Sequence, residues 1–167
     1  MRLPVLPIPP APRQLINKLP GIILQPVIRS PFLFQRLALE RILKQVFHEA
    51  ISDGDFDFLQ GRFLKVEIRD IGLCWYFSFN GKRLSVHRHA HADASICGEL
   101  REFLLLATRR EDPDTLFFQR RLQIDGDTEL GLEVKNMLDT IDLDVFTTGF
   151  SAAFNKLRNS LELLPHR

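Results

Sequence analysis

Between residues 64 and 86, apolar and polar side chains alternate one by one, which is the pattern of strands that bury a single face. Residues 64–69 read Leu-Lys-Val-Glu-Ile-Arg, and residues 71–79 carry Ile, Leu, Trp and two Phe at every second position. Asn80-Gly81 comes next and is a strong hairpin signal, and a further strand follows through Leu84 and Val86. The sequence therefore predicts a largely antiparallel sheet with one apolar face.

Helix patterns and two more strand patterns surround this group. The apolar stripe of residues 35–52 is the clearest helix, and Ser52-Asp53-Gly54-Asp55 ends it. The other expected elements are a strand at 92–97, a helix around 100–107, an aromatic helical turn after Asp112, a strand at 122–124, and helices at about 127–141 and 146–164. Strands and helices that are segregated in this way predict an α+β fold, a five-stranded mostly antiparallel sheet covered by helices. Where the helices do not fill the space over the sheet, a pocket remains.

The chain is expected to have three parts. Residues 1–34 are a proline-rich, apolar, basic arm with eight of the ten prolines; residues 35–142 are the folded domain; and residues 143–167 are an amphipathic helix that serves as a possible lid. The first 39 residues carry five basic side chains and no acid, which fits contact with an anionic membrane and fits a solvated tail equally well.

Nothing in the sequence has the length of a transmembrane segment. No apolar run reaches the roughly 20 residues that cross a bilayer, and the pattern of a cleaved signal peptide is not clean. We expect a cytoplasmic protein, with possible peripheral contact at the inner membrane.

The composition fits one soluble domain of 167 residues and gives no nucleic-acid signal, since the net charge is only +1. Cys74 and Cys97 have no disulfide or metal-site spacing, so reduced thiols are expected. Phenylalanine is unusually common, with 14 residues against one Trp and one Tyr. Because Phe has no polar atom to satisfy, it suits the wall of a dry cavity as well as a filled core.

Two polar groups resemble metal sites, and each has a plainer interpretation. Three histidines, His87, His89 and His91, would share one face of a strand and could converge on a metal ion, but imidazoles on a solvated strand are common. Three aspartates, Asp53, Asp55 and Asp57, imitate the start of a calcium loop. However, Phe58 and Leu64 stand where an EF-hand needs Gly and Glu.

Two further groups are candidates for acid–base chemistry or for anion binding. The acids of the region are Asp112, Asp114, Asp125, Asp127 and Glu129, which lack a convincing His or Lys partner and are better explained as turn and helix-cap residues. The arginines are Arg109, Arg110, Arg120 and Arg121, which flank Phe117-Phe118 and would either meet a phosphate or quinone head group or remain solvated. We therefore expect no catalytic residue, no metal and no cofactor.

One stretch carries a family resemblance. Residues 112–122 read Asp-Pro-Asp-Thr-Leu-Phe-Phe-Gln-Arg-Arg-Leu, and residues 126–131 read Gly-Asp-Thr-Glu-Leu-Gly. Upstream, Gly61-Arg62 and Arg69-Asp70-Ile71 are followed by Leu73 and Trp75. Together these residues resemble the sterol-carrier-protein-2 (SCP2-type) lipid-binding domain family, in its bacterial branch that assists ubiquinone biosynthesis. The resemblance covers about residues 35–141.

This resemblance implies a sheet backed by helices around an apolar lipid cavity. It also implies an accessory role in oxygen-independent ubiquinone biosynthesis, in which the protein binds a prenylated quinone intermediate or a phospholipid and presents it to pathway proteins, including UbiU and UbiV. No catalytic residue is carried over. The pocket residues that we expect are Leu73, Trp75, Phe77, Phe103, Leu104, Phe117, Phe118, Leu130, Val134 and Phe150.

Three other interpretations stay open. The protein could be a small enzyme that acts on an apolar quinone precursor, a non-ligand-binding adaptor that holds biosynthetic partners, or a general phospholipid carrier. Co-purified lipid would separate the carriers from the adaptor.

Overall fold

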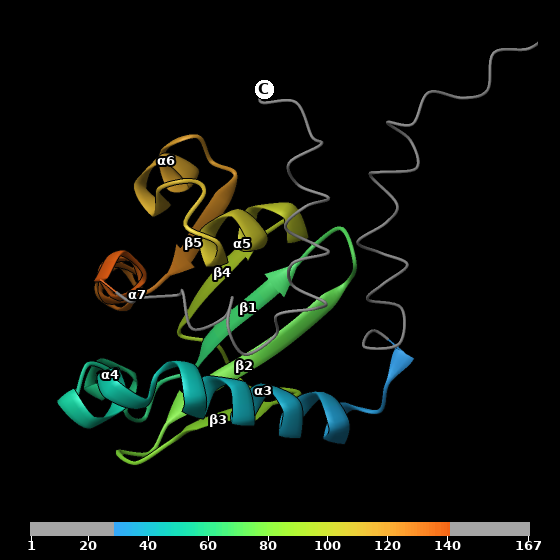
Figure 1. Cartoon of the computed structure of the whole chain (residues 1–167), viewed down its shortest axis with the longest axis vertical. Coiled ribbons are helices and arrows are strands. Elements are labelled where there is room, and N and C mark those ends of the chain that lie inside the picture. Colours follow the sequence, from blue (N-terminus) through green and yellow to red (C-terminus); the bar gives the residue numbers. More distant parts are fainter. Residues whose placement is uncertain (1–28, 141–167) are drawn as a thin grey trace, which may run out of the picture.

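The computed structural model describes residues 29–140, which form a five-stranded sheet with helices packed against it (Figure 1). In chain order the elements are α3 (Phe32–Val46), α4 (His48–Asp53), the 3-10 helix η1 (Asp57–Leu59), β1 (Leu64–Ile68), β2 (Leu73–Phe79), β3 (Leu84–His87), β4 (Ala94–Gly98), α5 (Leu100–Ala107), α6 (Pro113–Phe118), β5 (Leu122–Gly126) and α7 (Thr128–Thr140). The predicted α+β class is confirmed. The proline-rich arm up to residue 28, the C-terminal helix and Phe150 lie outside the described residues, and the three-part division of the chain stays a prediction.

The strands lie in the order β3-β2-β1-β4-β5. The pairs β1–β2, β2–β3 and β4–β5 are antiparallel, whereas β4 runs parallel to β1. The strand expected at 92–97 therefore does not extend the hairpins but crosses to the free side of β1. Its start is fixed there because Phe63 donates its N–H to Asp93 Oδ2 at 2.7 Å while Asp93 donates its own N–H to the Phe63 carbonyl at 2.9 Å.

The strand register collects the apolar residues on one face. That face is made by Leu64, Val66, Ile68, Leu73, Trp75, Phe77, Phe79, Leu84, Val86, Ala94, Ile96, Leu122 and Ile124. The described helices bury this face, while the opposite face is polar and every one of its side chains keeps exposed surface. The alternation in the sequence is confirmed as a sheet with one buried face.

The helix expected at 35–52 is two helices. It begins earlier, after Pro31, and it is interrupted at Phe47, where the backbone has φ −101° and ψ 21°. This change of direction turns the Phe47 side chain into the core, where its ring lies 5.3 Å from the ring of Phe56. The second helix ends at Gly54, whose φ of 84° suits a residue without Cβ, and this confirms the expected stop.

The hairpin predicted at Asn80-Gly81 is confirmed, but its loop has four residues. Asn80 donates its N–H to the Arg83 carbonyl at 3.3 Å, and its side-chain oxygen accepts N–H groups from Lys82 and Arg83. An Asn side chain that bonds to the following backbone stabilises such a turn.

Candidate functional site

The apolar face of the sheet is buried in two clusters that pack differently. In the first, Leu116, Leu122, Leu130 and Val134 have no exposed surface, while partly buried side chains such as Phe58 and Phe103 lie at its margin. The second joins β2 and its neighbours to α3 and α5. Its buried members are Ile68, Leu73, Trp75, Val86 and Leu100, and its partly exposed members are Phe32, Leu39, Leu43, Ile71, Phe77, Phe103 and Leu104. Partly buried members thus outnumber buried ones in the second cluster but not in the first.

The helix over the second cluster is incompletely buried along its length. Although α3 runs alongside β3 and β2 (Figure 1), none of its residues is fully buried. At its N-terminal half, Leu33, Phe34 and Leu37 are 59%, 65% and 58% exposed. The N-terminal half of α3 therefore presents apolar side chains to solvent as well as to the sheet. Exposed apolar patches of this kind commonly mark binding surfaces.

Polar contacts hold α3 against the sheet. Trp75, the only tryptophan, donates its indole N–H to Gln35 Oε1 at 3.1 Å. Glu40 Oε1 accepts the backbone N–H of Val86 at 3.0 Å and the Nε–H of Arg36 at 2.9 Å. Burial alone would raise the pKa of the Glu40 carboxyl, but the hydrogen bonds from Val86 and Arg36 outweigh it and lower the pKa.

Two anchors hold α5, which covers the other side of the second cluster. Asp70 Oδ1 accepts the N–H of Leu100 at 2.9 Å at the start of the helix. Glu102 is only 6% exposed and forms an ion pair with Arg121, which also bonds to Glu111. Burial would lower the pKa of Arg121, but the hydrogen bonds to Glu111 and Glu102 raise it. These contacts hold both helices against the sheet.

The expected pocket residues divide among several places. Leu73, Trp75, Phe77, Phe103 and Leu104 come together in the second cluster. Leu130 and Val134 belong to the first, enclosed cluster, with Phe117 partly buried against it.

Other residues depart from the expected set. Phe118 is 91% exposed on α6. The sequence reasoning missed Phe32 and Ile71, which pack against the second cluster. The signal for Ile71 was its place in the alternating pattern of residues 71–79, whereas Phe32 was missed because the helix was expected to begin at residue 35.

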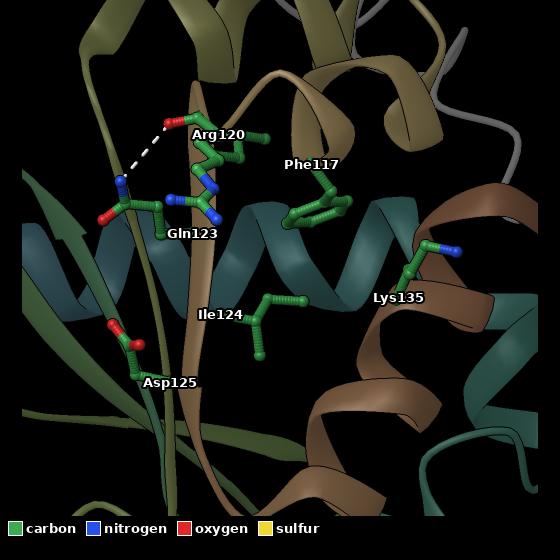
Figure 2. A pocket seen from close by; sticks show the side chains of 7 residues that line it. Phe117, Arg120, Gln123, Ile124, Asp125 and Lys135 are labelled. Carbon is green, nitrogen blue, oxygen red and sulfur yellow. Dashed lines mark hydrogen bonds between the residues drawn. The ribbon is translucent and has the colours of Figure 1, made fainter.

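A separate hollow of about 540 Å³ lies beside β5. It is lined by Phe117, Arg120, Leu122, Gln123, Ile124, Asp125 and Lys135. Figure 2 shows Phe117, Ile124 and Lys135 on the α7 side of the strand, with Gln123 and Asp125 on the other. A second hollow of about 520 Å³ shares Phe117 and Lys135 with it and is also lined by Phe118. Both hollows are open, and charged side chains line both of them.

The polar candidates are occupied in structural roles. His87 bonds to Ser78 Oγ at 2.9 Å, whereas His89 and His91 lie exposed after β3. Asp112 accepts the N–H of Thr115 and Asp127 that of Leu130, which confirms the helix-cap interpretation. Between residues 29 and 140, no group of three His, Cys, Asp or Glu side chains is placed to hold a metal ion.

Among the four arginines, Arg121 is taken up by its ion pairs with Glu102 and Glu111. Arg109 donates to the Asp139 carbonyl at 3.2 Å. Arg120 lines the hollow beside β5. The side chains of Arg109, Arg120 and Arg121 are therefore not gathered around one anion site.

The sequence matches the SCP-2 sterol transfer family over residues 39–139. The chain belongs to this family. It is 46% identical over 125 residues to the ubiquinone biosynthesis accessory factor UbiT of Escherichia coli strain K12, covering 75% of this chain and 72% of that protein. The UbiT of Escherichia coli O157:H7 gives the same identity and coverage. The resemblance to the SCP2-type family, in its ubiquinone-accessory branch, is thus confirmed.

A solved structure supports the fold. A protein described as "UbiJ-SCP2 Ubiquinone synthesis protein" superposes with a TM-score of 0.53 at 18% identity, covering 65% of this chain and 97% of that one. At this identity the likeness concerns the fold alone. Of the helices in the described range, none has the length and apolar character that crossing a bilayer requires.

Proposed function

We propose that this protein is a lipid-binding accessory factor of ubiquinone biosynthesis. Its site is the second apolar cluster, where the tail of a prenylated quinone intermediate or of a phospholipid lies between β2, α3 and α5. The observation that carries the proposal is the contrast in packing: more than half of the members of this cluster, Phe77 and Leu104 among them, are only partly buried. Family membership and the 46% identity to UbiT support the same role.

The chemistry of the cluster favours a hydrocarbon tail over a polar ligand. Each CH₂ group that leaves water contributes about 0.8 kcal/mol, so a tail of several isoprene units gains affinity without any specific hydrogen bond. A polar head group would find no partner among these side chains and would stay at the surface, within reach of pathway enzymes. The protein therefore presents a substrate rather than transforming it.

The exposed end of α3 supports contact with a membrane. Leu33, Phe34 and Leu37 are apolar and exposed, and two exposed cations lie nearby in the sequence, Arg29 before α3 and Arg41 on it. An apolar patch with basic neighbours binds the surface of an anionic bilayer. Peripheral contact at the inner membrane would bring the second cluster close to its lipid.

Within the pathway we place the protein in the oxygen-independent branch, with UbiU and UbiV among its partners. This assignment follows from the family resemblance of residues 112–131, whereas the similarity to UbiT supports an accessory role in ubiquinone biosynthesis. Purified full-length chain is expected to retain UbiU or UbiV in a pull-down, and failure to retain either protein would remove these partners from the proposal while leaving lipid binding to its own test.

The direct test is mass spectrometry of organic extracts from the purified full-length protein. Leu104→Trp fills the second cluster with a larger apolar side chain, so bound lipid should fall by about tenfold if roughly 1.4 kcal/mol of tail contact is lost. Leu132→Trp is the matched control, because Leu132 is 56% exposed on α7 and outside the cluster. Wild-type protein that yields a clean extract, or equal lipid in both variants, would contradict the proposal.

A further inference from the structure

The two edge strands of the sheet, β3 and β5, differ in the hydrogen-bond partners of their outer backbone groups. On β3, the N–H of Val86 donates a hydrogen bond to the Glu40 carboxylate of α3. On β5, no side chain or strand among residues 29–140 bonds to the outer backbone groups. An open edge strand is a template for another chain, and proteins commonly block such edges with proline, bulges or covering elements. The sequence Leu-Gln-Ile-Asp-Gly of β5 contains no proline.

The pairing of β5 with β4 shows which backbone groups are free. Asp127 donates its N–H to the Asp93 carbonyl at 2.8 Å, which identifies this pair as a hydrogen-bonded one. In an antiparallel ladder such pairs recur at every second residue, so Gln123 and Asp125 bond inward to β4. The N–H and C=O groups of Leu122, Ile124 and Gly126 therefore point away from the sheet.

The charges along this strand are self-complementary. Arg120, which is exposed, comes before the strand, and Asp125 and Asp127, which are also exposed, come at and after its end. If two copies of β5 pair antiparallel with Ile124 opposite Ile124, the basic start of each strand lies beside the acidic end of the other. Gln123 then lies opposite Asp125 of the second copy, where an amide can donate to a carboxylate.

The apolar surface beside the strand would be covered by the same pairing. Phe117 and Ile124 line the hollow on the α7 side of β5 (Figure 2). Pairing about Ile124 brings the two hollows against each other and removes their apolar walls from water. Gly126 has φ 103°, and a Cβ there would collide with the Asp93 carbonyl, so the end of the strand depends on glycine to keep its course.

We propose that the β5 edge is a self-association surface, through which two copies of this chain join their sheets into one continuous sheet about a two-fold axis at Ile124. The proposal does not depend on lipid binding, because the second apolar cluster involves neither β5 nor α7.

The test is the mass of the full-length protein in solution, by analytical ultracentrifugation over a range of concentrations. Wild type should populate a dimer. Ile124→Pro removes the outward N–H that the pairing needs, while Ile124→Ala removes a similar part of the side chain but keeps the N–H. The proline variant should be monomeric, and the alanine variant should keep at least part of the dimer.

Charge reversal provides a second test that leaves the strand backbone intact. Arg120→Glu places like charges together across the two-fold axis and should weaken dimerisation by about tenfold or more. Lys82→Glu, an exposed reversal in the β2–β3 loop at the other edge, should leave it unchanged. A wild type that stays monomeric, or a dimer that tolerates both Ile124→Pro and Arg120→Glu, overturns the proposal.

Discussion

The two apolar clusters lie on one face of one sheet, yet they differ in what their side chains do. In the first, residues such as Leu130 and Val134 are completely enclosed; in the second, more than half of the members, among them Phe77 and Leu104, are only partly buried although they are as apolar. Enclosed side chains contribute fully to stability, because both their hydration and their packing change on folding. Partly exposed side chains contribute less to folding stability. A ligand that covers them removes their remaining apolar surface from water, which favours binding.

The largest effect that this comparison predicts is at the first cluster. Leu130→Ala should lower the free energy of unfolding by about 2–5 kcal/mol, because it leaves a cavity among enclosed neighbours. Urea denaturation of the purified protein measures the loss. The lipid content of the folded variant should stay at the wild-type level, and a loss of lipid without loss of stability would reverse the roles of the two clusters.

A smaller effect is expected at the polar contact that holds α3 beside the second cluster. Glu40→Ala leaves the N–H of Val86 without its partner and should cost about 1–3 kcal/mol. Gln45→Ala, an exposed change on the same helix, should cost less than about 0.5 kcal/mol. Equal values for the two variants, from parallel urea titrations, would mean that Glu40 does not fix the helix.

Truncation within the second cluster should cost less again. Leu104→Ala is expected to lower the stability of lipid-free protein by about 1–2 kcal/mol, because the side chain is only partly buried. The informative quantity is its difference from Leu130→Ala under identical conditions. A loss at residue 104 as large as that at residue 130 would show that the second cluster is packed as closely as the first.

The smallest effect concerns pH. Because the pKa of Glu40 is lowered in the folded protein, its charge stabilises the fold above the carboxyl's ordinary pKa, and this contribution is lost as the pH falls through the lowered value. The stability difference between wild type and Glu40→Gln should therefore be constant near neutral pH and shrink in acid. Thermal melts of both proteins across the acid range test this, and a difference that grows on acidification would contradict it.

Local signals predicted much of this fold. The alternation along residues 64–86 predicted the buried face because strand geometry converts every second residue into one side of a sheet. The hairpin at Asn80, the helix stop at Gly54 and the cap at Asp112 were predictable for a similar reason, since each depends on contacts within a few residues.

Non-local contacts explain what could not be predicted. The parallel pairing of β4 with β1 depends on Phe63 and Asp93, which are 30 residues apart. In the short helix α6, composition does not distinguish Phe117, which packs partly on the core, from Phe118, which faces solvent. Likewise, nothing local to β5 indicates that its outer edge has no partner among residues 29–140, while Glu40 of α3 accepts an N–H from the outer edge of β3.

The most direct test of lipid binding at the second cluster uses Trp75, the single tryptophan, which lies within it. Lipid with bromine atoms on its tail quenches indole fluorescence on contact, so titration of the full-length protein with such a lipid reports where the tail lies. We predict saturable quenching, and it should be weakened by Phe103→Asp but not by Leu132→Asp. Bound brominated lipid that leaves the fluorescence of Trp75 unchanged would contradict the account.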